Sequence, residues 1–128
     1  MTVDNFCEWK KRGPKEKQPY AIAPPGRELM ALTGLWDIWR LAGGETIRSF
    51  TIIATKPNDE MAPIRKRMPT ILSKTVSPRW LGEREAPPDA AAEPLVPYGG
   101  HLAMWPFHKD LGNVRDNRAG LIEAIAAA

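Results

Sequence analysis

The stretch LMALTGLWDIWRLAGGETIRSFTIIATK, residues 29–56, decides the fold. Its first part, residues 29–39, is short and apolar nearly throughout, which is typical of a buried central β-strand. The small residues at 42–45 turn the chain, and the β-branched and aromatic content of 47–56 favours a second strand. Gly34, inside the first strand, predicts a bulge or the close approach of another backbone. An antiparallel pair is therefore expected at the centre of a β-rich protein.

The segment before this pair predicts another hairpin. Val3 to Lys10 suits an extended strand, and KRGPKEKQ at 11–18 has the glycine and proline of a loop at its centre. Pro19 to Ala23 forms the return strand, and PPGRE at 24–28 is a turn. The first half of the chain is thus expected to be a β-meander.

The second half predicts shorter elements. A helix beginning at Asn58 or Asp59 as N-cap would be limited to a turn or two by Pro63. The other expected elements are a strand at 69–72, helical turns at 77–84, a loop at 86–100, a strand at 101–107 and a strand or frayed helix at 119–128.

Composition excludes several classes of protein. A chain of 128 residues, 43% hydrophobic and 26% charged, is expected to form one globular domain. It has no apolar run of the roughly 18 to 20 residues that cross a bilayer and no signal-peptide pattern at its start, so we expect a cytoplasmic protein without membrane contact. Its single cysteine and two histidines lack the spacing of a zinc site, so we expect no metal and no other cofactor.

Charge and aromatic residues indicate a possible nucleic-acid partner. KKRGPKEK at 10–17 holds five basic residues and one acidic residue, and IRKRMP at 64–69 is a second basic cluster. Tryptophans beside basic loops can stack on the bases of single-stranded nucleic acids. Core packing is the preferred interpretation for Trp36 and Trp80, whereas packing and stacking remain equally open for Trp9 and Trp39. Basic runs are also common on solvated loops, so neither cluster decides the matter alone.

Five segments in order resemble the SOS-response-associated peptidase (SRAP) family, whose members attach themselves to abasic sites in single-stranded DNA. The segments are DNFCEWKK, KQPYAIA, ALTGLWDIW, FTIIATKPNDEMAPIRKRMPTIL and WPFHKDLGNVRDNRAGLIEAI. The resemblance implies an α+β, mainly β fold: an incomplete, barrel-like antiparallel sheet with short helices. It also implies abasic single-stranded DNA as the partner, with association with the nucleoid when DNA is bound.

The family's chemistry, as the resemblance implies it, begins with a cysteine at the second position that becomes the N-terminus. Its amine condenses with the ring-opened sugar and its thiol then closes a thiazolidine ring. A carboxylate and a histidine move the protons. By resemblance, Glu8 is that carboxylate and Arg65 replaces the histidine. The resemblance places Thr55 and Arg67 at the DNA and Asn113 in the bordering turn. We expect the neighbours of Glu8, namely Trp9, Lys10 and Lys11, to face the DNA as well.

Two departures from the family pattern change the expected activity. The family domain begins upstream of Met1, so 1–128 is expected to be a single truncated SRAP-like domain, the C-terminal part of a longer or decaying gene product. An arginine at position 65 stays protonated and cannot exchange a proton as imidazole does. Peptidase or lyase activity of this chain is therefore left open, with impaired catalysis expected.

Three alternatives stay open. Thr2 would offer a substitute amine if Met1 were removed, and Cys7 a substitute thiol. Alternation along a strand places Cys7 opposite to Glu8, in an expected apolar pocket. The chain could instead be a non-catalytic DNA-binding or interaction fragment, or an inactive gene remnant, and its oligomeric state is not predicted.

Overall fold

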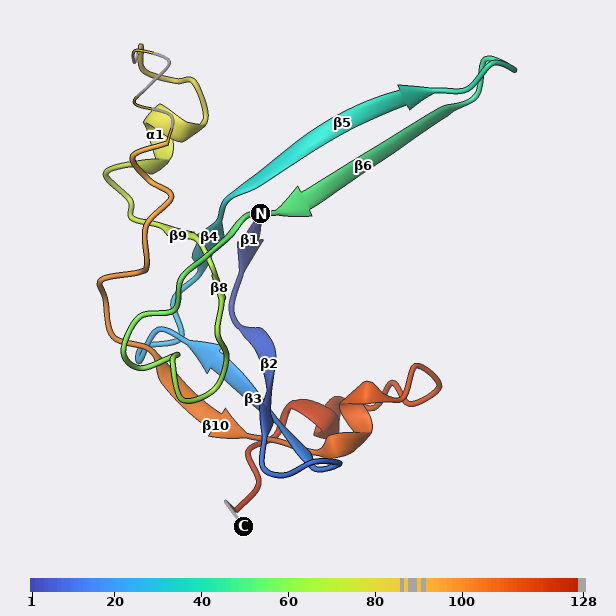
Figure 1. Cartoon of the computed structure of the whole chain (residues 1–128), viewed down its shortest axis with the longest axis vertical. Helices are drawn as coiled ribbons and strands as arrows, with labels where there is room; N and C mark the ends of the chain where they lie inside the picture. The colour runs from blue at the N-terminus through green and yellow to red at the C-terminus, as the bar shows by residue number, and fades with distance from the viewer. Residues whose placement is uncertain (86, 88–89, 91, 127–128) are drawn as a thin grey trace.

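Short antiparallel strands joined by turns are the main regular structure of the chain (Figure 1). The computed structural model describes residues 1–85, 87, 90 and 92–126. Within these residues the helical elements are short: α1 at Ser77–Trp80, and two 3₁₀ helices, η2 at Lys109–Gly112 and η3 at Ala119–Ile122. The mainly β class is confirmed, and the described strands form four separate antiparallel sheets that do not close into a barrel.

One three-stranded sheet has the order β10-β3-β2. β2 (Phe6–Lys11) and β3 (Lys17–Ala23) form the expected hairpin, in which Glu8 pairs with Tyr20. β10 (Ala103–Pro106) adds to the other edge of β3. The expected first strand is interrupted, because Thr2–Val3 forms a separate strand, β1, in another sheet.

The second three-stranded sheet has the order β1-β4-β9, in which β4 spans Met30–Leu32 and β9 spans Ile71–Leu72. β7 (Ala54–Thr55) and β8 (Met68–Pro69) form a small antiparallel pair of their own, and β8 comes just before β9 in the sequence. Backbone hydrogen bonds join the breaks between these strands: Thr33 N–H donates to the Thr70 carbonyl, Ile53 N–H to Thr33, and Thr70 N–H to Ile53. Three strands therefore change direction at one shared junction.

Beyond that junction, β5 (Gly34–Arg40) and β6 (Thr46–Ile52) form a long hairpin that projects from the body (Figure 1). The turn at 42–45 is confirmed, and Gly44 adopts φ +85°, a conformation that favours glycine. A Cβ on Gly34 would lie 2.8 Å from the Thr51 carbonyl oxygen, so the predicted close backbone approach is also confirmed.

The prediction of a buried central strand at 29–39 was wrong beyond the junction. β4 is largely buried, but β5 has no buried residue, and the Trp36 expected in the core is 75% exposed. Trp39 is 64% exposed, which excludes the packing interpretation for that side chain in this chain. The apolar pattern identified the strand, but no described element covers it.

The core lies where the two three-stranded sheets and the 58–68 segment meet. Ile22, Met61 and Met68 are fully buried in it. The expected helix at 58–68 forms successive turns instead, and Asn58 caps them as predicted, its Oδ1 accepting the Met61 N–H at 2.9 Å. The buried Met61 thus anchors the turn that follows it.

The remaining segments agree only partly with expectation. The helical turn at 77–84 shortens to α1, and Trp80 is half-buried rather than in the core. The expected loop at 86–100 and the end of 119–128 lie partly outside the described residues, and η3 replaces the strand or frayed helix where the end is described. In the described part of the chain, no helix is long and apolar enough to span a membrane.

Candidate nucleic-acid interface

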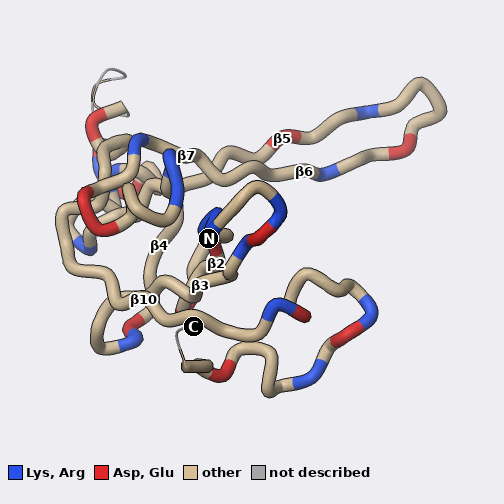
Figure 2. The backbone as a smooth tube through the Cα atoms, turned by 60° about the horizontal axis from the view of Figure 1, so that its bottom comes forward, with Lys and Arg blue, Asp and Glu red and all other residues tan. Residues whose placement is uncertain are grey.

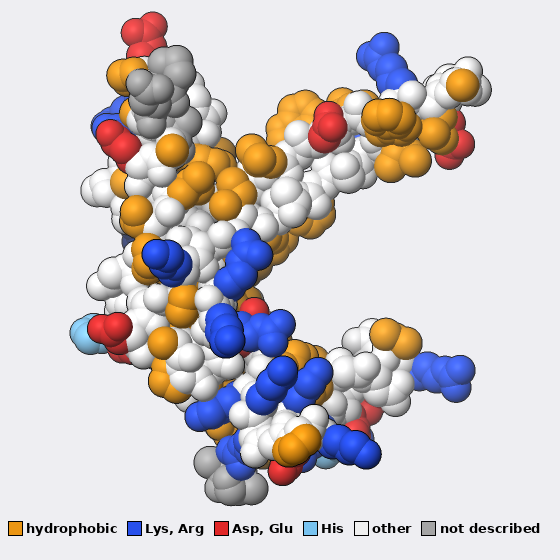
Figure 3. Space-filling model, in the orientation of Figure 1, with side chains coloured by type: hydrophobic (Ala, Val, Ile, Leu, Met, Phe, Trp, Pro, Cys, Tyr) orange, Lys and Arg blue, Asp and Glu red, His pale blue; other side chains and the backbone are white. Residues whose placement is uncertain are grey.

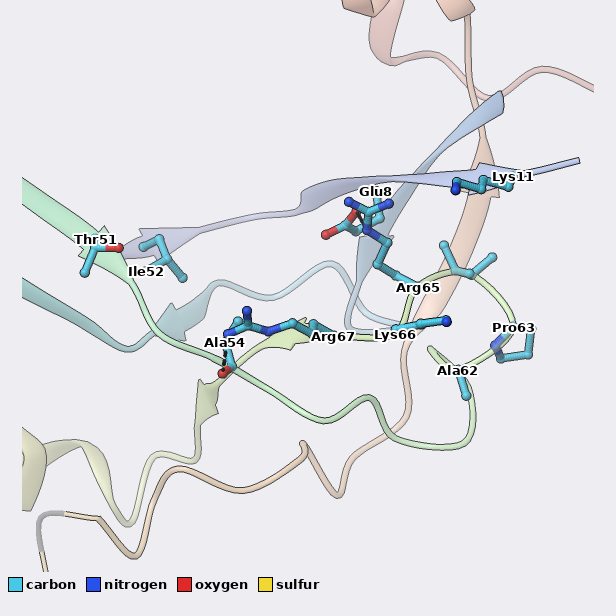
Figure 4. Close-up of a pocket in the computed structure, with 11 residues that line it drawn as sticks. Glu8, Lys11, Thr51, Ile52, Ala54, Ala62, Pro63, Arg65, Lys66 and Arg67 are labelled. Carbon is cyan, nitrogen blue, oxygen red and sulfur yellow. Dashed lines mark hydrogen bonds and ion pairs between the residues drawn. The ribbon is translucent and has the colours of Figure 1, made fainter. Parts of the chain in front are cut away.

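A hollow of about 850 Å³ lies between β2, the end of β6 and the turn that leads into β8 (Figure 4). It is lined by Glu8, Lys11, Thr51, Ile52, Ala54, Ala62, Pro63, Ile64, Arg65, Lys66 and Arg67. We call it the cationic pocket, because four of these residues are basic and one is acidic. Strands fix one wall and the turn anchored by Met61 fixes the other.

Glu8 and Arg65 meet across the cationic pocket. Arg65 Nε lies 3.3 Å from Glu8 Oε2, and the two side chains are 50% and 24% exposed respectively. Glu8 comes from the middle of β2, whereas Arg65 stands on the turn, whose backbone is held by the Arg65 N–H donating to the Met61 carbonyl. An ion pair this exposed stabilises a fold by about 0–1 kcal/mol, so its main effect is on the charge and shape of the pocket.

The other cations surround this pair. Arg67 Nη2 donates to the Ala54 carbonyl at 3.3 Å, which directs the guanidinium across the end of β7. Lys66 and Lys11 add charge from the turn and from the end of β2. Figure 2 marks basic positions in the loop beyond β2 and close to β7, and Figure 3 shows basic side chains gathered over the body. The pocket therefore suits a polyanion more than a neutral ligand.

Comparison with known proteins agrees with this arrangement. The family model described as SOS response associated peptidase (SRAP) matches residues 1–114. The chain belongs to the SRAP family. The resemblance read from the five sequence segments is thereby confirmed.

Curated SRAP relatives are abasic site processing proteins. YoqW of Bacillus subtilis is 39% identical over 97% of this chain and 56% of its own length. HMCES of Xenopus tropicalis is 31% identical over 98% of this chain and 42% of its own length. The chain spans about half the length of these relatives.

Solved structures show the same fold. A protein from Bacteroides thetaiotaomicron matches with a TM-score of 0.83 at 23% identity, over 98% of this chain and 56% of that protein. A protein from Bordetella bronchiseptica matches with a TM-score of 0.72 over 84% of this chain. The fold of this chain is therefore shared with these two solved structures.

Several residues that we expected at the DNA lie outside the cationic pocket. Lys10 and Thr55 are not among its lining residues, and the Thr55 hydroxyl donates to the Leu95 carbonyl at 3.5 Å. Asn113 ends η2, where its Oδ1 accepts the Arg115 N–H. Of the predicted residues, the structure thus brings together Glu8, Lys11, Arg65 and Arg67.

Trp9 packs instead of facing the cationic pocket. Its ring lies against η2, since a Cβ on Gly112 would be 3.3 Å from two of its atoms, and the side chain is half-buried. Alternation along β2 directs Trp9 and Glu8 to opposite faces. Lys66 belongs to the basic cluster at 64–69, and its place in the 64–67 turn, next to Arg65 and Arg67, makes it a pocket residue.

Neither substitute nucleophile lies in the cationic pocket. Cys7 is exposed, so the prediction of an apolar pocket around it was wrong. Neighbouring protein atoms partly desolvate the thiol and raise its pKa, and the carboxylates of Glu8 and Asp4 raise it further. Thr2 lines a different hollow, at the base of the β5–β6 hairpin.

The described residues hold no cluster of three or more histidine, cysteine, aspartate or glutamate side chains that could bind a metal ion. The nearest arrangement is a pair: His101 Nδ1 lies 3.0 Å from Glu60 Oε1, and the Leu102 N–H donates to Glu60 Oε2. The His101 hydrogen bond and then the Leu102 amide lower the pKa of Glu60. This pair holds the start of β10 against the 58–64 turns.

Proposed function

We propose that this chain provides the single-stranded DNA-binding surface of an abasic-site processing protein, and that alone it does not form a covalent bond to DNA. The observation that carries the proposal is the cationic pocket, in which Lys11, Arg65, Lys66 and Arg67 surround Glu8. The names of the SRAP relatives support abasic sites as the target.

The binding part of the proposal depends on charge and on shape. Arginine guanidinium groups form two parallel hydrogen bonds to a phosphate, and lysine adds a point charge. Arg67 is already held by the Ala54 carbonyl, so little side-chain freedom is lost when a phosphate arrives.

The catalytic part of the proposal concerns the Glu8–Arg65 pair. A carboxylate beside an abasic sugar can accept and return a proton. A guanidinium stays protonated at working pH and therefore cannot exchange one. The Glu8 carboxylate is also already engaged in the 3.3 Å ion pair with Arg65. None of the described residues that line the pocket is a cysteine, and alternation along β2 directs the neighbouring Cys7 to the face opposite to Glu8. Binding without covalent attachment follows from these three features.

Two assays with the purified chain test the proposal. Fluorescence anisotropy with a labelled single-stranded oligonucleotide should show weak, salt-sensitive binding that Arg67→Ala reduces and Arg84→Ala, a control on an exposed arginine outside the pocket, does not. A denaturing gel after incubation with abasic DNA should show free DNA only.

Specific results would contradict each part. A slow-migrating adduct that survives denaturation would show that the chain has a nucleophile, and its loss in Thr2→Ala or Cys7→Ala would identify that residue. Equal loss of affinity in Arg67→Ala and Arg84→Ala would show that the pocket is not the binding surface.

A further inference from the structure

The β5–β6 hairpin exposes apolar side chains on both of its faces. Cross-strand pairing places Trp36 opposite Phe50 on one face and Trp39 opposite Ile47 on the other. The exposed large apolar side chains of the hairpin are Leu35, Trp36, Ile38, Trp39, Leu41, Ile47 and Phe50. Isolated two-stranded hairpins are marginally stable in water, and contiguous apolar patches on a folded surface mark interaction sites.

The Trp36 face continues into the body. At the base of the hairpin a second hollow, of about 520 Å³, is lined by Trp36 and Phe50 together with Leu32, Leu72 and Trp80. Figure 3 shows apolar side chains along the hairpin and onto the adjoining body. We call this continuous surface the apolar cleft. The hollow at its base gives it a concave apolar part, which suits a polypeptide segment with apolar side chains.

Charge argues against a nucleic acid as the occupant. Residues 34–52 carry two acidic side chains, Asp37 and Glu45, and two basic ones, Arg40 and Arg48. The hairpin is therefore neutral, whereas the cationic pocket has a surplus of positive charge. A phosphate backbone gains affinity mainly from cations, so DNA has little reason to follow the hairpin.

The solved relative indicates what covers the apolar cleft. The Bacteroides thetaiotaomicron protein superposes on 98% of this chain, hairpin included, yet this match uses only 56% of that protein. YoqW leaves a similar share of its length unmatched. The same projecting hairpin is thus found in proteins that have a further stretch of polypeptide in addition to it.

We propose that the apolar cleft is the docking surface for the part of an SRAP domain that the matched region does not span, and that it binds this part even as a separate polypeptide. The Trp36–Phe50 pair and the hollow at its base are the main contact, and the Trp39 face is covered by the same partner. This proposal concerns assembly and does not depend on DNA binding by the cationic pocket.

The test uses the full chain and, as the probe, the YoqW polypeptide that lies outside its matched region, produced by co-expression with an affinity tag on the probe. We expect the two to purify together as a one-to-one complex by light scattering. Hydrogen exchange of residues 34–52 should slow in the complex relative to the chain alone. Recovery of the chain without the probe, with those amides unprotected, would overturn the proposal.

Matched variants locate the contact. Trp36→Glu with Phe50→Glu should weaken the complex by about tenfold or more, since buried aromatic residues dominate such interfaces. Val114→Glu is the control, because Val114 is 99% exposed and lies outside the apolar cleft. Circular dichroism of each variant checks that the body stays folded.

Two further results would also contradict the proposal. A stable dimer of this chain alone, with protected hairpin amides, would assign the cleft to a second copy. Equal weakening by Val114→Glu would show that the contact is elsewhere. An Arg67→Ala variant that loses DNA binding but still forms the complex would support the docking proposal. The test of docking is therefore independent of the test of the proposed function.

Discussion

The β2–β3 hairpin and the β5–β6 hairpin are antiparallel pairs of similar length that meet different surroundings. β3 receives β10 on its free edge and buries Ala21, Ile22 and Ala23. β5 and β6 pair only with each other, and neither has a buried residue. The covered pair positions Glu8 in a charged pocket, and the uncovered pair presents aromatic rings to solvent. Burial here depends on the neighbouring elements and less on the apolar character of the strand.

The largest expected effect separates the two regions by stability. Phe107 follows β10 and is fully buried, whereas Phe50 on β6 is 67% exposed. Phe107→Ala should lower the free energy of unfolding by about 3–5 kcal/mol through the cavity that it leaves. Phe50→Ala should change it by less than about 0.5 kcal/mol. Urea denaturation followed by circular dichroism measures both, and similar losses would mean that the hairpin is packed in solution.

The next largest effect is the dependence of oligonucleotide affinity on salt concentration, which we expect only for the region that contains the cationic pocket. Neutralising one phosphate with each of the four pocket cations gives a slope of about −2.8 in log affinity against log salt for a single strand. The affinity for an oligonucleotide should then fall roughly 50-fold between 50 and 200 mM salt. Anisotropy titrations at several salt concentrations give the slope, and a slope near zero would exclude phosphate contacts.

Substitution of one residue from each region sharpens the contrast. Arg67→Ala should reduce the salt slope by about 0.7, since one phosphate contact is lost. Trp39→Ala should leave both the slope and the affinity unchanged, because the neutral hairpin adds no phosphate contact. A clear loss of affinity in Trp39→Ala would indicate that bases stack on the exposed hairpin after all.

A smaller effect is expected at Glu8. Glu8→Gln removes the carboxylate that lies 3.3 Å from Arg65, and with it a negative charge that opposes the binding of phosphates in the pocket. The affinity for an oligonucleotide should rise by about two- to threefold, as expected for the loss of one partly exposed charge interaction. The same titration measures it, and a fall in affinity would mean that Glu8 itself holds the bound strand.

The smallest effect lies on the other face of β2. The raised pKa of Cys7 means that less of the thiol is ionised near neutral pH than in a free cysteine peptide. Iodoacetamide labelling should therefore be slower than in such a peptide at pH 8 and should accelerate as the pH rises further. Asp4→Asn removes one of the carboxylates that raise the pKa and should speed labelling slightly. Labelling as fast as in the peptide would contradict this account.

The local signals in the sequence predicted local structure well. The paired strands, the close approach at Gly34, the Asn58 cap and the limit set by Pro63 all follow from backbone chemistry near each residue. The exposure of Trp36 could not be predicted, because apolar content tells what a strand would bury and not whether a covering element is present. The apolar run at 29–39 divides into β4 and β5 because Thr33 forms backbone hydrogen bonds with residues that are distant in the sequence. Such contacts are not contained in the local pattern.

The candidate site was predictable in part. The pairing of Glu8 with position 65 came from resemblance to the SRAP family, and the structure places their atoms 3.3 Å apart. The absence of Thr55 from the pocket lining could have been inferred from strand alternation. Ala54 lines the pocket, and the next side chain along a strand points to the other face. The packing of Trp9 on Gly112 joins residues about a hundred positions apart, and no local pattern contains that information.

Ile52, the last residue of β6, lines both the cationic pocket and the hollow at the base of the hairpin. The two surfaces therefore share Ile52 as part of their walls. Any polypeptide that shifts Ile52 by filling the hollow would also reshape the space available to DNA. Thermodynamic reciprocity then requires that DNA change the affinity for that polypeptide by the same factor.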